Sequence, residues 1–417
     1  MTYEESVRFL YSLGNELKAA RYDLARMRVL LDALGNPHAR GQFIHVAGTN
    51  GKGSTCAMIE AGLRAAGFRT GLYTSPHLAE PTERIQMNGQ PISREQFASA
   101  FEQVHARAEA LMASGGLDQH STYFESVTAM AFLTLSTACD WVVLEVGLGG
   151  RLDATNVVTP ALCVITPVDF DHEAWLGRSI EAIAGEKAGI LKPGIPAVIT
   201  PQRREADSVI RQKAGEIGAP IIDPREWPVR DVELDRFGSR FLLGDLEITC
   251  PLAGEHQVEN ARTAAVALKS IGVPDDAIQK GISAARWPGR LERVAQDPEV
   301  VIDGAHNPAG ARALAAYIDR FYSREPLTLI YGAMRDKAVE EVAGTLFPRF
   351  AEVIVTAPRQ PRSLAPESLV EVVDHPNVRV TADLAAAVGQ IHQTTFISGS
   401  LFLVAEAREL FAGKSTP

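Results

Sequence analysis

The stretch that decides the fold runs from Gln42 to Thr55 and reads QFIHVAGTNGKGST. It opens with a short apolar run over 43–47, which is brief and β-branched enough to predict a buried strand. A glycine-rich turn follows, and the segment from Thr55 to Ala66 then has helical periodicity. A strand, a glycine-rich turn and a helix, in this order, are typical of a phosphate-binding loop.

The chemistry of this loop comes from its glycines and from Lys52. Glycines allow backbone N–H groups to turn toward phosphate oxygens, and the N-terminus of the following helix adds partial positive charge. Lys52 would reach the β- and γ-phosphates of a nucleotide. The spacing departs from the usual motif, because Val46 stands where a glycine is common and an extra glycine precedes Ser54. The alternative is an ordinary glycine-rich turn between a strand and a helix.

Length and composition limit the class of protein. At 417 residues the chain is too long for one typical core, so we expect two domains. A net charge of −10 argues against nucleic acid as the main partner. No apolar stretch approaches the roughly 18 residues that would span a membrane. The cysteines show neither a CxxC pair nor zinc spacing, and the N-terminus lacks a signal-peptide pattern, so we expect a cytoplasmic protein.

A carboxylate stands late in a second apolar run. The segment 140–146, DWVVLEV, predicts a buried strand that carries Glu145 near its end. Burying a carboxylate without a cation is costly, and Mg²⁺ prefers oxygen ligands, so Glu145 is a candidate Mg²⁺ ligand. A structural ion pair is the alternative.

Two further polar residues follow predicted strands. Ser75 comes after the strand expected over 69–74, at the edge where open α/β sheets bind ligands, although a plain turn is the alternative. His172 comes after the strand expected over 161–166 and stands beside Asp171, a residue type that orients metal-ligating histidines.

The last third of the chain predicts a second sheet. A turn signal at 287–290 is followed by alternating strand and helix patterns, which indicate a smaller Rossmann-like sheet. We therefore expect domains over 1–287 and 288–417. The patterns that support the second domain lie at 300–302, 309–321, 327–331, 353–356 and 394–398.

Several motifs together resemble those of the folylpolyglutamate synthases and dihydrofolate synthases, within the Mur ligase superfamily. The resemblance extends from about residue 20 to about residue 410. It implies an α/β fold, with a P-loop-containing parallel-sheet N-terminal domain of the Mur ligase type and a smaller Rossmann-like C-terminal domain. The motifs are GTNGKGS at 48–54, TSPHL at 74–78, TYFE at 122–125, DHEAWLG at 171–177, EKAGI at 186–190, GEHQVENA at 254–261 and DGAHNP at 303–308.

The resemblance also implies cofactors and site residues. It places ATP against Thr49, Asn50, Gly51, Lys52, Gly53, Ser54, Asn260, Arg290, Asp303 and His306, and two Mg²⁺ ions against Ser75, Glu145, His172 and Lys187. Lys52, Lys187 and His172 would be the catalytic residues. In Mur-type ligases the lysine of EKAGI is carbamylated, which makes it an anionic oxygen ligand. Without the resemblance, Lys187 would be a solvated helix residue and DGAHNP a helix N-cap.

A pterin site is implied by two more segments. A DLGLER-like segment at 23–26 and the TYFE motif would contact the pteroate group, but this chain has alanine at 25, where the family has glycine. Outside these segments, the chain also has alanine at 338, where the family usually has aspartate. From the residues alone, 22–27 would be a surface helix and Phe124 a core residue. The implied substrate-binding residues are Asp23, Leu24, Ala25, Arg26, Thr122, Tyr123, Phe124 and Leu152.

The activity that the resemblance implies is ATP-dependent carbon–nitrogen ligation. A substrate carboxylate of dihydropteroate or a folate would attack the γ-phosphorus, and the amino group of L-glutamate would then attack the acyl phosphate. We expect a monomer that closes about the 286–290 linker.

Three alternatives are weaker. TSPHL and the Asp23 segment argue against a UDP-muramyl ligase, and the second domain argues against a P-loop kinase or GTPase. A non-catalytic nucleotide-binding module would have no need of Glu145, His172 and Lys187. ATP consumption that depends on L-glutamate would separate a ligase from the last two.

Overall fold

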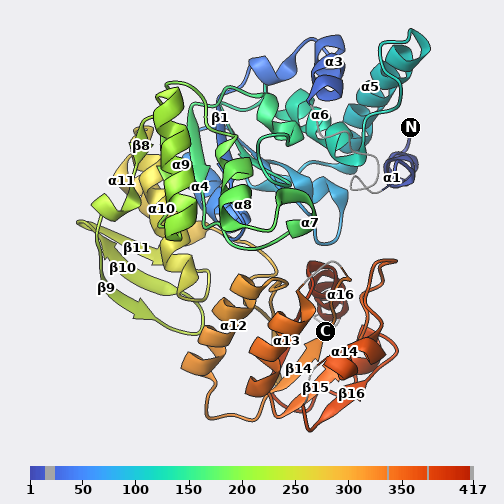
Figure 1. Cartoon of the computed structure of the whole chain (residues 1–417), viewed down its shortest axis with the longest axis vertical. Helices are drawn as coiled ribbons and strands as arrows, with labels where there is room; N and C mark the ends of the chain where they lie inside the picture. Colours follow the sequence, from blue (N-terminus) through green and yellow to red (C-terminus); the bar gives the residue numbers. More distant parts are fainter. Residues whose placement is uncertain (15–23, 336–337, 373–374, 414–417) are drawn as a thin grey trace.

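A computed structural model describes residues 1–14, 24–335, 338–372 and 375–413, and its largest sheet has eight strands (Figure 1). The strand order is β4-β3-β2-β5-β1-β6-β7-β8; the pairs β2–β3 and β3–β4 are antiparallel and the other pairs are parallel. The strands are β1 (Phe43–Ala47), β2 (Thr70–Tyr73), β3 (Ile85–Met87), β4 (Gln90–Pro91), β5 (Trp141–Glu145), β6 (Leu162–Ile165), β7 (Ala197–Ile199) and β8 (Ile221–Ile222).

Strand β1 lies at the centre of this sheet, between β5 and β6. All five of its residues are buried, as expected of a parallel strand that is covered on both faces. The helix after it, α4 (Lys52–Ala65), begins at Lys52, three residues before the predicted start at Thr55. Its N-cap, Gly51, has a φ of 82°, which favours glycine. The strand, turn and helix of the predicted phosphate loop are therefore present.

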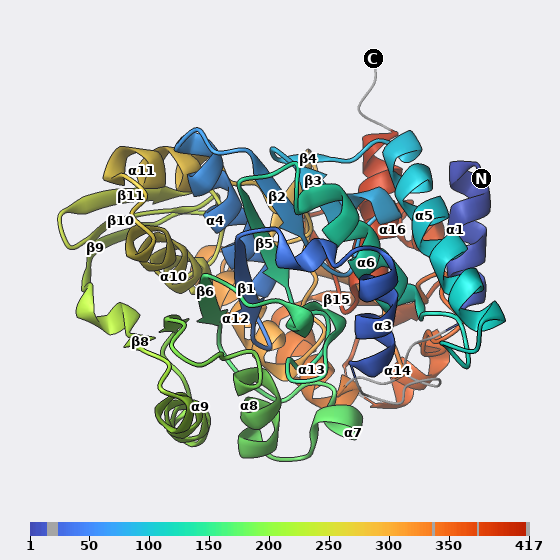
Figure 2. The same cartoon turned by 90° about the horizontal axis from the view of Figure 1, so that it is seen from above.

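Helices cover both faces of the eight-stranded sheet (Figure 2). Alternate β1 residues point to opposite faces, so that Ile44 and Val46 pack on one side and Phe43 on the other. The first face packs against α4, α10 (His256–Ser270) and α11 (Asp275–Ala284). The second face packs against α1 (Tyr3–Ser12), α3 (Ala25–Ala33), α5 (Arg94–Ala113), α6 (Tyr123–Leu135), α8 (Ile180–Ala188) and α9 (Arg204–Ile217).

A small antiparallel sheet follows β8 in the sequence. It consists of β9 (Val229–Leu234), β10 (Ser239–Leu243) and β11 (Leu246–Cys250), in the order β11-β10-β9. Its inward-facing residues, Phe241 and Ile248, join the core formed by α4, α10 and α11. This sheet therefore extends the first face of the main sheet.

The last third forms a six-stranded sheet in the order β12-β13-β17-β14-β15-β16, with β12 antiparallel. This confirms the predicted Rossmann-like sheet. The predicted boundary at 287/288 falls in the connection from α11 to β12. The elements are β12 (Glu292–Gln296), β13 (Glu299–Ile302), α12 (Pro308–Phe321), β14 (Thr328–Tyr331), α13 (Val339–Leu346), β15 (Glu352–Val355), α14 (Pro366–Val372), β16 (Val378–Val380), α15 (Leu384–Val388), β17 (Thr395–Ser398) and α16 (Leu401–Ala412).

Among the described residues, no helix combines the length and the apolar character that a membrane span requires.

The packing of α11 on α4 gives a stability prediction. A Cβ at Gly281 would overlap the backbone of Gly62, so Gly281→Ala should destabilise the protein by about 1–3 kcal/mol through overpacking. Gly215→Ala is the matched control, because nothing lies within 4 Å of that position in α9 and alanine favours helix by up to about 1 kcal/mol. Urea unfolding followed by circular dichroism measures both changes. If the Gly281→Ala variant unfolds at a urea concentration equal to or above that of Gly215→Ala, the result would contradict this packing.

Candidate functional site

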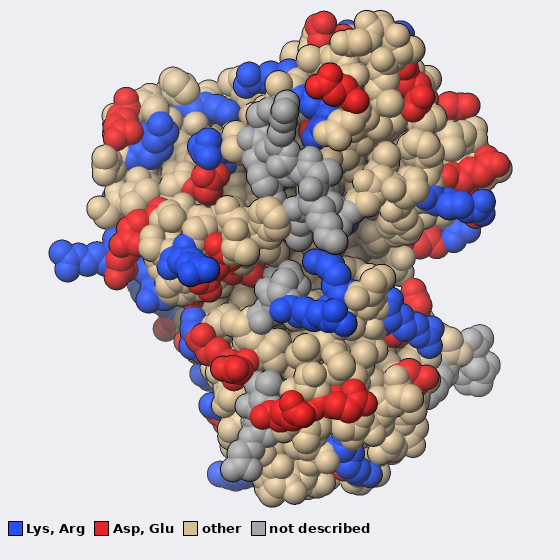
Figure 3. Space-filling view, turned by 45° about the vertical axis from the view of Figure 1, so that its right-hand side comes forward, with Lys and Arg blue, Asp and Glu red and all other residues tan. Residues whose placement is uncertain are grey.

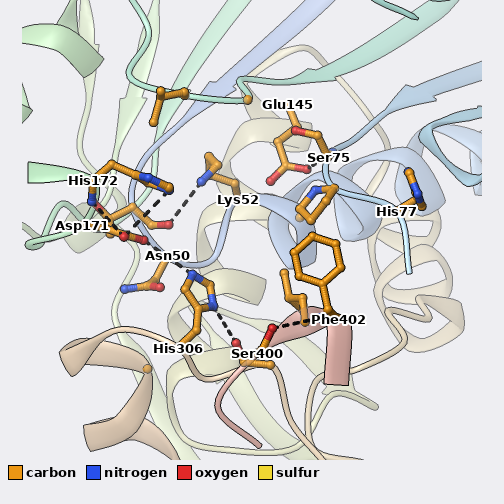
Figure 4. Close-up of a pocket in the computed structure, with 18 of the residues that line it drawn as sticks. Asn50, Lys52, Ser75, His77, Glu145, Asp171, His172, His306, Ser400 and Phe402 are labelled. Atoms are coloured by element: carbon orange, nitrogen blue, oxygen red, sulfur yellow. Dashed lines mark hydrogen bonds and ion pairs between the residues drawn. The ribbon is translucent and has the colours of Figure 1, made fainter. Parts of the chain in front are cut away.

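A single cavity of about 1110 Å³ brings together residues from both large sheets (Figure 4). Its walls come from the carboxyl ends of β1, β5, β6 and β13, the edge at which α/β sheets bind ligands. Figure 3 shows the molecule narrowing between its upper and lower parts, with basic side chains gathered at that level. The predicted residues that line the cavity are Thr49, Asn50, Gly51, Lys52, Gly53, Ser54, Ser75, Tyr123, Phe124, Glu145, His172, Lys187, Asn260, Arg290, Asp303 and His306.

Two lysines meet at one backbone carbonyl. The Nζ atoms of Lys52 and Lys187 lie 3.1 and 2.9 Å from the carbonyl oxygen of Gly48, and both donate to it. Lys187 is 4% exposed, and burial, with the charge of Lys52 as the next cause, lowers its pKa to about 7. Lys187 is therefore a buried amine with a large neutral fraction near neutral pH, unlike the solvated helix lysine that its sequence position alone suggests.

Glu145 is the last residue of β5, and Lys52 lies between it and His172 in the cavity (Figure 4). It is buried, and its Oε2 accepts a hydrogen bond of 3.0 Å from the backbone N–H of Ser75. Burial raises the pKa of this carboxyl group, and the charge of Lys52 opposes the rise. Within the described part of the chain, no salt bridge involves Glu145, so the structural ion pair considered as an alternative is not seen there. Its role as a Mg²⁺ ligand stays a prediction.

Asp171 connects the two parts of the chain across the cavity (Figure 4). Its Oδ1 lies 3.8 Å from Nε2 of His172, and its Oδ2 lies 3.5 Å from Nε2 of His306. The same Oδ2 accepts a hydrogen bond of 3.1 Å from Asn307. Asp171 thus contacts residues that follow β13, and its role in orienting His172 stays a prediction.

Asn307 is a functional candidate that the sequence reasoning did not assign. It is 2% exposed, and it donates a hydrogen bond of 3.0 Å to Asn50 in the phosphate loop. Its side chain also accepts from the N–H of Gly310 and so caps α12, the structural role considered for DGAHNP. Its place in that motif, between His306 and Pro308, is the signal that could have identified it.

A second unassigned residue, Gln257, links Asn260 to the phosphate loop. Asn260 donates to Gln257 over 2.9 Å, and Gln257 donates to the hydroxyl of Ser54 over 3.2 Å. The two residues are three positions apart on α10, a spacing that places them on one helix face. Gly51 lies so close to Asn260 that a Cβ there would overlap its side chain.

The loop after β13 is held by Asp303. Its two oxygens accept hydrogen bonds of 2.9 Å each from the backbone N–H groups of Leu291 and Ala305. Burial raises the pKa of Asp303, and the nearby charge of Arg290 opposes the rise. Arg290 itself donates to the carbonyl of Gly289 and lines the cavity.

Aromatic side chains from the first turn of α6 line another wall of the cavity. The ring of Tyr123 stacks on Tyr11 at 5.7 Å and lies below the guanidinium of Arg84 at 5.0 Å. The ring of Phe124 occupies the space in which a side chain at Gly147 would lie. This wall offers a flat apolar surface for a ring system.

Some predicted substrate residues lie elsewhere. Leu24, Ala25, Arg26, Thr122 and Leu152 do not line the cavity, and Asp23 lies outside the described residues. Arg26 is in the first turn of α3 and pairs with Glu125 of α6 at 2.7 Å. Thr122 caps α6. Both residues therefore contact the helix that carries Tyr123 and Phe124, and a direct substrate contact stays a prediction.

Comparison with known proteins adds independent evidence. Residues 46–268 match the Mur ligase middle domain, and residues 289–405 match the Mur ligase, glutamate ligase domain. The folylpolyglutamate synthase of Lacticaseibacillus casei is 37% identical over 100% of both chains. The dihydrofolate synthase/folylpolyglutamate synthase of Bacillus subtilis is 35% identical over 93% of this chain and 94% of its own.

A solved structure agrees with these relatives. The structure of E. coli FolC in complex with DHPP and ADP superposes with a TM-score of 0.88 at 30% identity, over 100% of this chain and 99% of that one. The resemblance seen in the sequence is thus confirmed, and neither a UDP-muramyl ligase nor a P-loop phosphotransferase is favoured. The chain belongs to the folylpolyglutamate synthase/dihydrofolate synthase family of Mur ligases, which are ATP-dependent acid–amino-acid ligases.

Proposed function

We propose that this chain joins L-glutamate to dihydropteroate, to the glutamate tail of tetrahydrofolate, or to both. The observation that carries the proposal is the shared cavity, in which a phosphate loop, a buried carboxylate and an aromatic wall face residues from the second sheet. The E. coli relative whose structure holds DHPP and ADP supports a pterin and a nucleotide as ligands of such a cavity.

The first step is transfer of the γ-phosphoryl group of ATP to the substrate carboxylate. A carboxylate oxygen forms the new bond to phosphorus, and ADP leaves. Lys52 exchanges its hydrogen bonds to the carbonyls of Gly48 and Thr49 for phosphate oxygens and neutralises part of their charge. Positioning and charge stabilisation account for most of the catalysis of such a transfer.

The second step forms the amide bond. The neutral amino group of L-glutamate attacks the carbonyl carbon of the acyl phosphate, and inorganic phosphate leaves. Because phosphate is already a good leaving group, this step needs no nucleophilic side chain. His306 and Asp303 line the cavity from the second sheet, and we propose that they contact the nucleotide and that the two parts, 1–287 and 288–417, close on it.

Mg²⁺ fits the donor groups that surround the phosphate loop. Glu145 is a buried carboxylate whose pKa is raised by burial, so a cation beside it would offset the cost of its charge. The hydroxyl of Ser75 and the Asp171-supported ring of His172 also face the cavity. When bound, two Mg²⁺ ions would neutralise the triphosphate.

Lys187 fits this site only if it loses its positive charge. Two unit charges 4 Å apart repel by about 4 kcal/mol at an effective dielectric near 20, and Lys52 already supplies one positive charge. Carbamylation adds CO₂ to the neutral amine and releases one proton to solvent, and it would give Lys187 the oxygen donors that Mg²⁺ prefers. The lowered pKa of Lys187 supports this modification, because it supplies the neutral amine at ordinary pH.

We propose that the enzyme acts as a cytoplasmic monomer. The nucleotide-binding and metal-binding residues predicted in this chain converge on one cavity, which supports a monomer. The net charge of −10 makes nucleic acid an unfavourable partner.

A direct test combines ATP, Mg²⁺, dihydropteroate and L-glutamate. We expect ADP release that requires both acceptor and glutamate, with a product that mass spectrometry finds heavier by one glutamyl residue. Lys52→Ala should lower kcat by a factor of 100 or more, because it removes a cation from the phosphate site, whereas Lys213→Ala on the outer helix α9 should not change it. ADP release over many turnovers that is independent of glutamate, or a Lys52→Ala variant with full activity, would contradict the proposal.

The aromatic wall gives a second test. Phe124→Ala should raise KM for dihydropteroate at least tenfold and leave KM for ATP within twofold, because only the ring-binding surface is lost. Phe68→Ala, at an exposed position outside the cavity, is the matched control and should change neither constant. Steady-state kinetics measures both. An equal rise in the two KM values would instead indicate a packing role for Phe124.

A further inference from the structure

Away from the cavity, three potential metal ligands converge on the second face of the main sheet. His105 and Glu109 lie on α5, and His120 lies in the segment that leads into α6. One ligand atom from each residue lies within 4.8 Å of the others, and no other group of this kind occurs among the described residues. Neither the catalytic cavity nor the chemistry proposed for it uses these side chains.

The hydrogen bonds of His120 aim one of its nitrogens at His105. Its Nδ1 lies 2.9 Å from the carbonyl oxygen of Ser121 and 3.3 Å from the Ser121 hydroxyl. Because a carbonyl only accepts, the shorter contact favours the tautomer with the proton on Nδ1. The Nε2 atom therefore keeps its lone pair, and it lies 3.1 Å from Nδ1 of His105. A backbone carbonyl that fixes the tautomer in this way is a usual partner of a metal-ligating histidine.

The spacing of the donors suits a small transition-metal ion. Metal–nitrogen bonds of about 2.0–2.1 Å in a tetrahedral site place two nitrogens about 3.4 Å apart, close to the separation of the two rings. Glu109 follows His105 by one helical turn, so its exposed side chain can swing toward both rings without moving the backbone. Two imidazoles and a carboxylate are a ligand set of Zn²⁺ sites that keep a fourth position for water.

Packing holds the two rings in place. The ring of Phe9 lies 4.4 Å from that of His105 and 5.3 Å from that of His120, and Phe101 stacks on His105 at 5.5 Å. The rings are thus supported from the protein side and half-buried, while Glu109 faces solvent. This arrangement provides two oriented nitrogen donors and an open path for an ion.

We propose that His105, Glu109 and His120 bind one divalent transition-metal ion of the Zn²⁺ type. Without the ion, Nδ1–H of His105 donates to Nε2 of His120; on binding, the ion takes the place of that proton, and solvent returns a proton to Nε2 of His105. The bound ion ties α5 to the segment before α6. Two residues beyond His120 lies Thr122, the cap of the helix whose first turn lines the cavity.

The test uses Co²⁺ as a spectroscopic substitute for Zn²⁺, with the full chain freed of metal by a chelator and kept in excess Mg²⁺. The excess Mg²⁺ is added to compete with Co²⁺ for the oxygen-rich ligands proposed for the catalytic cavity. The variants are His105→Gln and His120→Gln. The matched control is His392→Gln, because the Nδ1 of His392 also lies 2.9 Å from a backbone carbonyl, that of Gln390, and the residue is exposed.

We expect wild type and His392→Gln to bind one equivalent of Co²⁺ and to show the visible absorption bands of a Co²⁺ ion with a low coordination number. One equivalent of Zn²⁺ should abolish these bands. The two site variants should lose at least tenfold in affinity while they still bind ADP. Glu109→Gln, at an exposed position, should weaken binding without affecting the fold. Absence of the bands in wild type, or equal Co²⁺ affinity in His105→Gln and wild type, would overturn the proposal.

Discussion

The arrangement of the site depends on the carbonyl of Gly48, to which both Lys52 and Lys187 donate. Gly48 directly follows β1, so the two amines, from α4 and α8, meet at the end of the central strand of the largest sheet. A buried cation beside a second cation is costly unless an anion joins them or one of them is neutral. Burial first, and the charge of Lys52 next, lower the pKa of Lys187, and a polyphosphate or a change in charge would relieve this constraint.

Polar contacts join the two parts of the chain, and Leu78 and Ala253 of the first part also pack against apolar clusters of the second. Asn307 binds both Asn50 and Asp171, and Arg312 pairs with Asp169 at 2.7 Å. Polar interfaces between domains of one chain permit relative motion, because little apolar surface is exposed when they open. This property suits a site whose nucleotide lies between the two sheets and whose substrates must enter and leave.

The sequence predicted β1 to the residue, because a parallel strand covered on both faces has a continuous apolar pattern. It placed the start of α4 too late, since Lys52 and Gly53 do not resemble a helix until the turn is known. Strands β12 and β16 were missed; most of their residues are partly or fully exposed and therefore give no apolar run.

The sequence predicted those site residues that stand in local motifs. The phosphate loop, Glu145, His172 and Lys187 each stand in a recognisable segment, and the structure brings them to one cavity. The contacts of Asn307 with Asn50 and of Gln257 with Ser54 join positions more than 200 residues apart, so no local pattern reveals them. Leu152 shows the opposite case, a residue within a motif region that does not reach the cavity.

The most direct measurement of the charge state of Lys187 is ¹³C NMR of the protein equilibrated with ¹³C-bicarbonate, Mg²⁺ and ADP. Because the neutral amine reacts and the pKa of Lys187 is about 7, the account predicts one carbamate signal that grows as the pH rises through this value. The signal should be absent from Lys187→Arg, which should also be inactive. No carbamate signal from a wild-type enzyme that retains full activity in bicarbonate-free buffer would contradict the account.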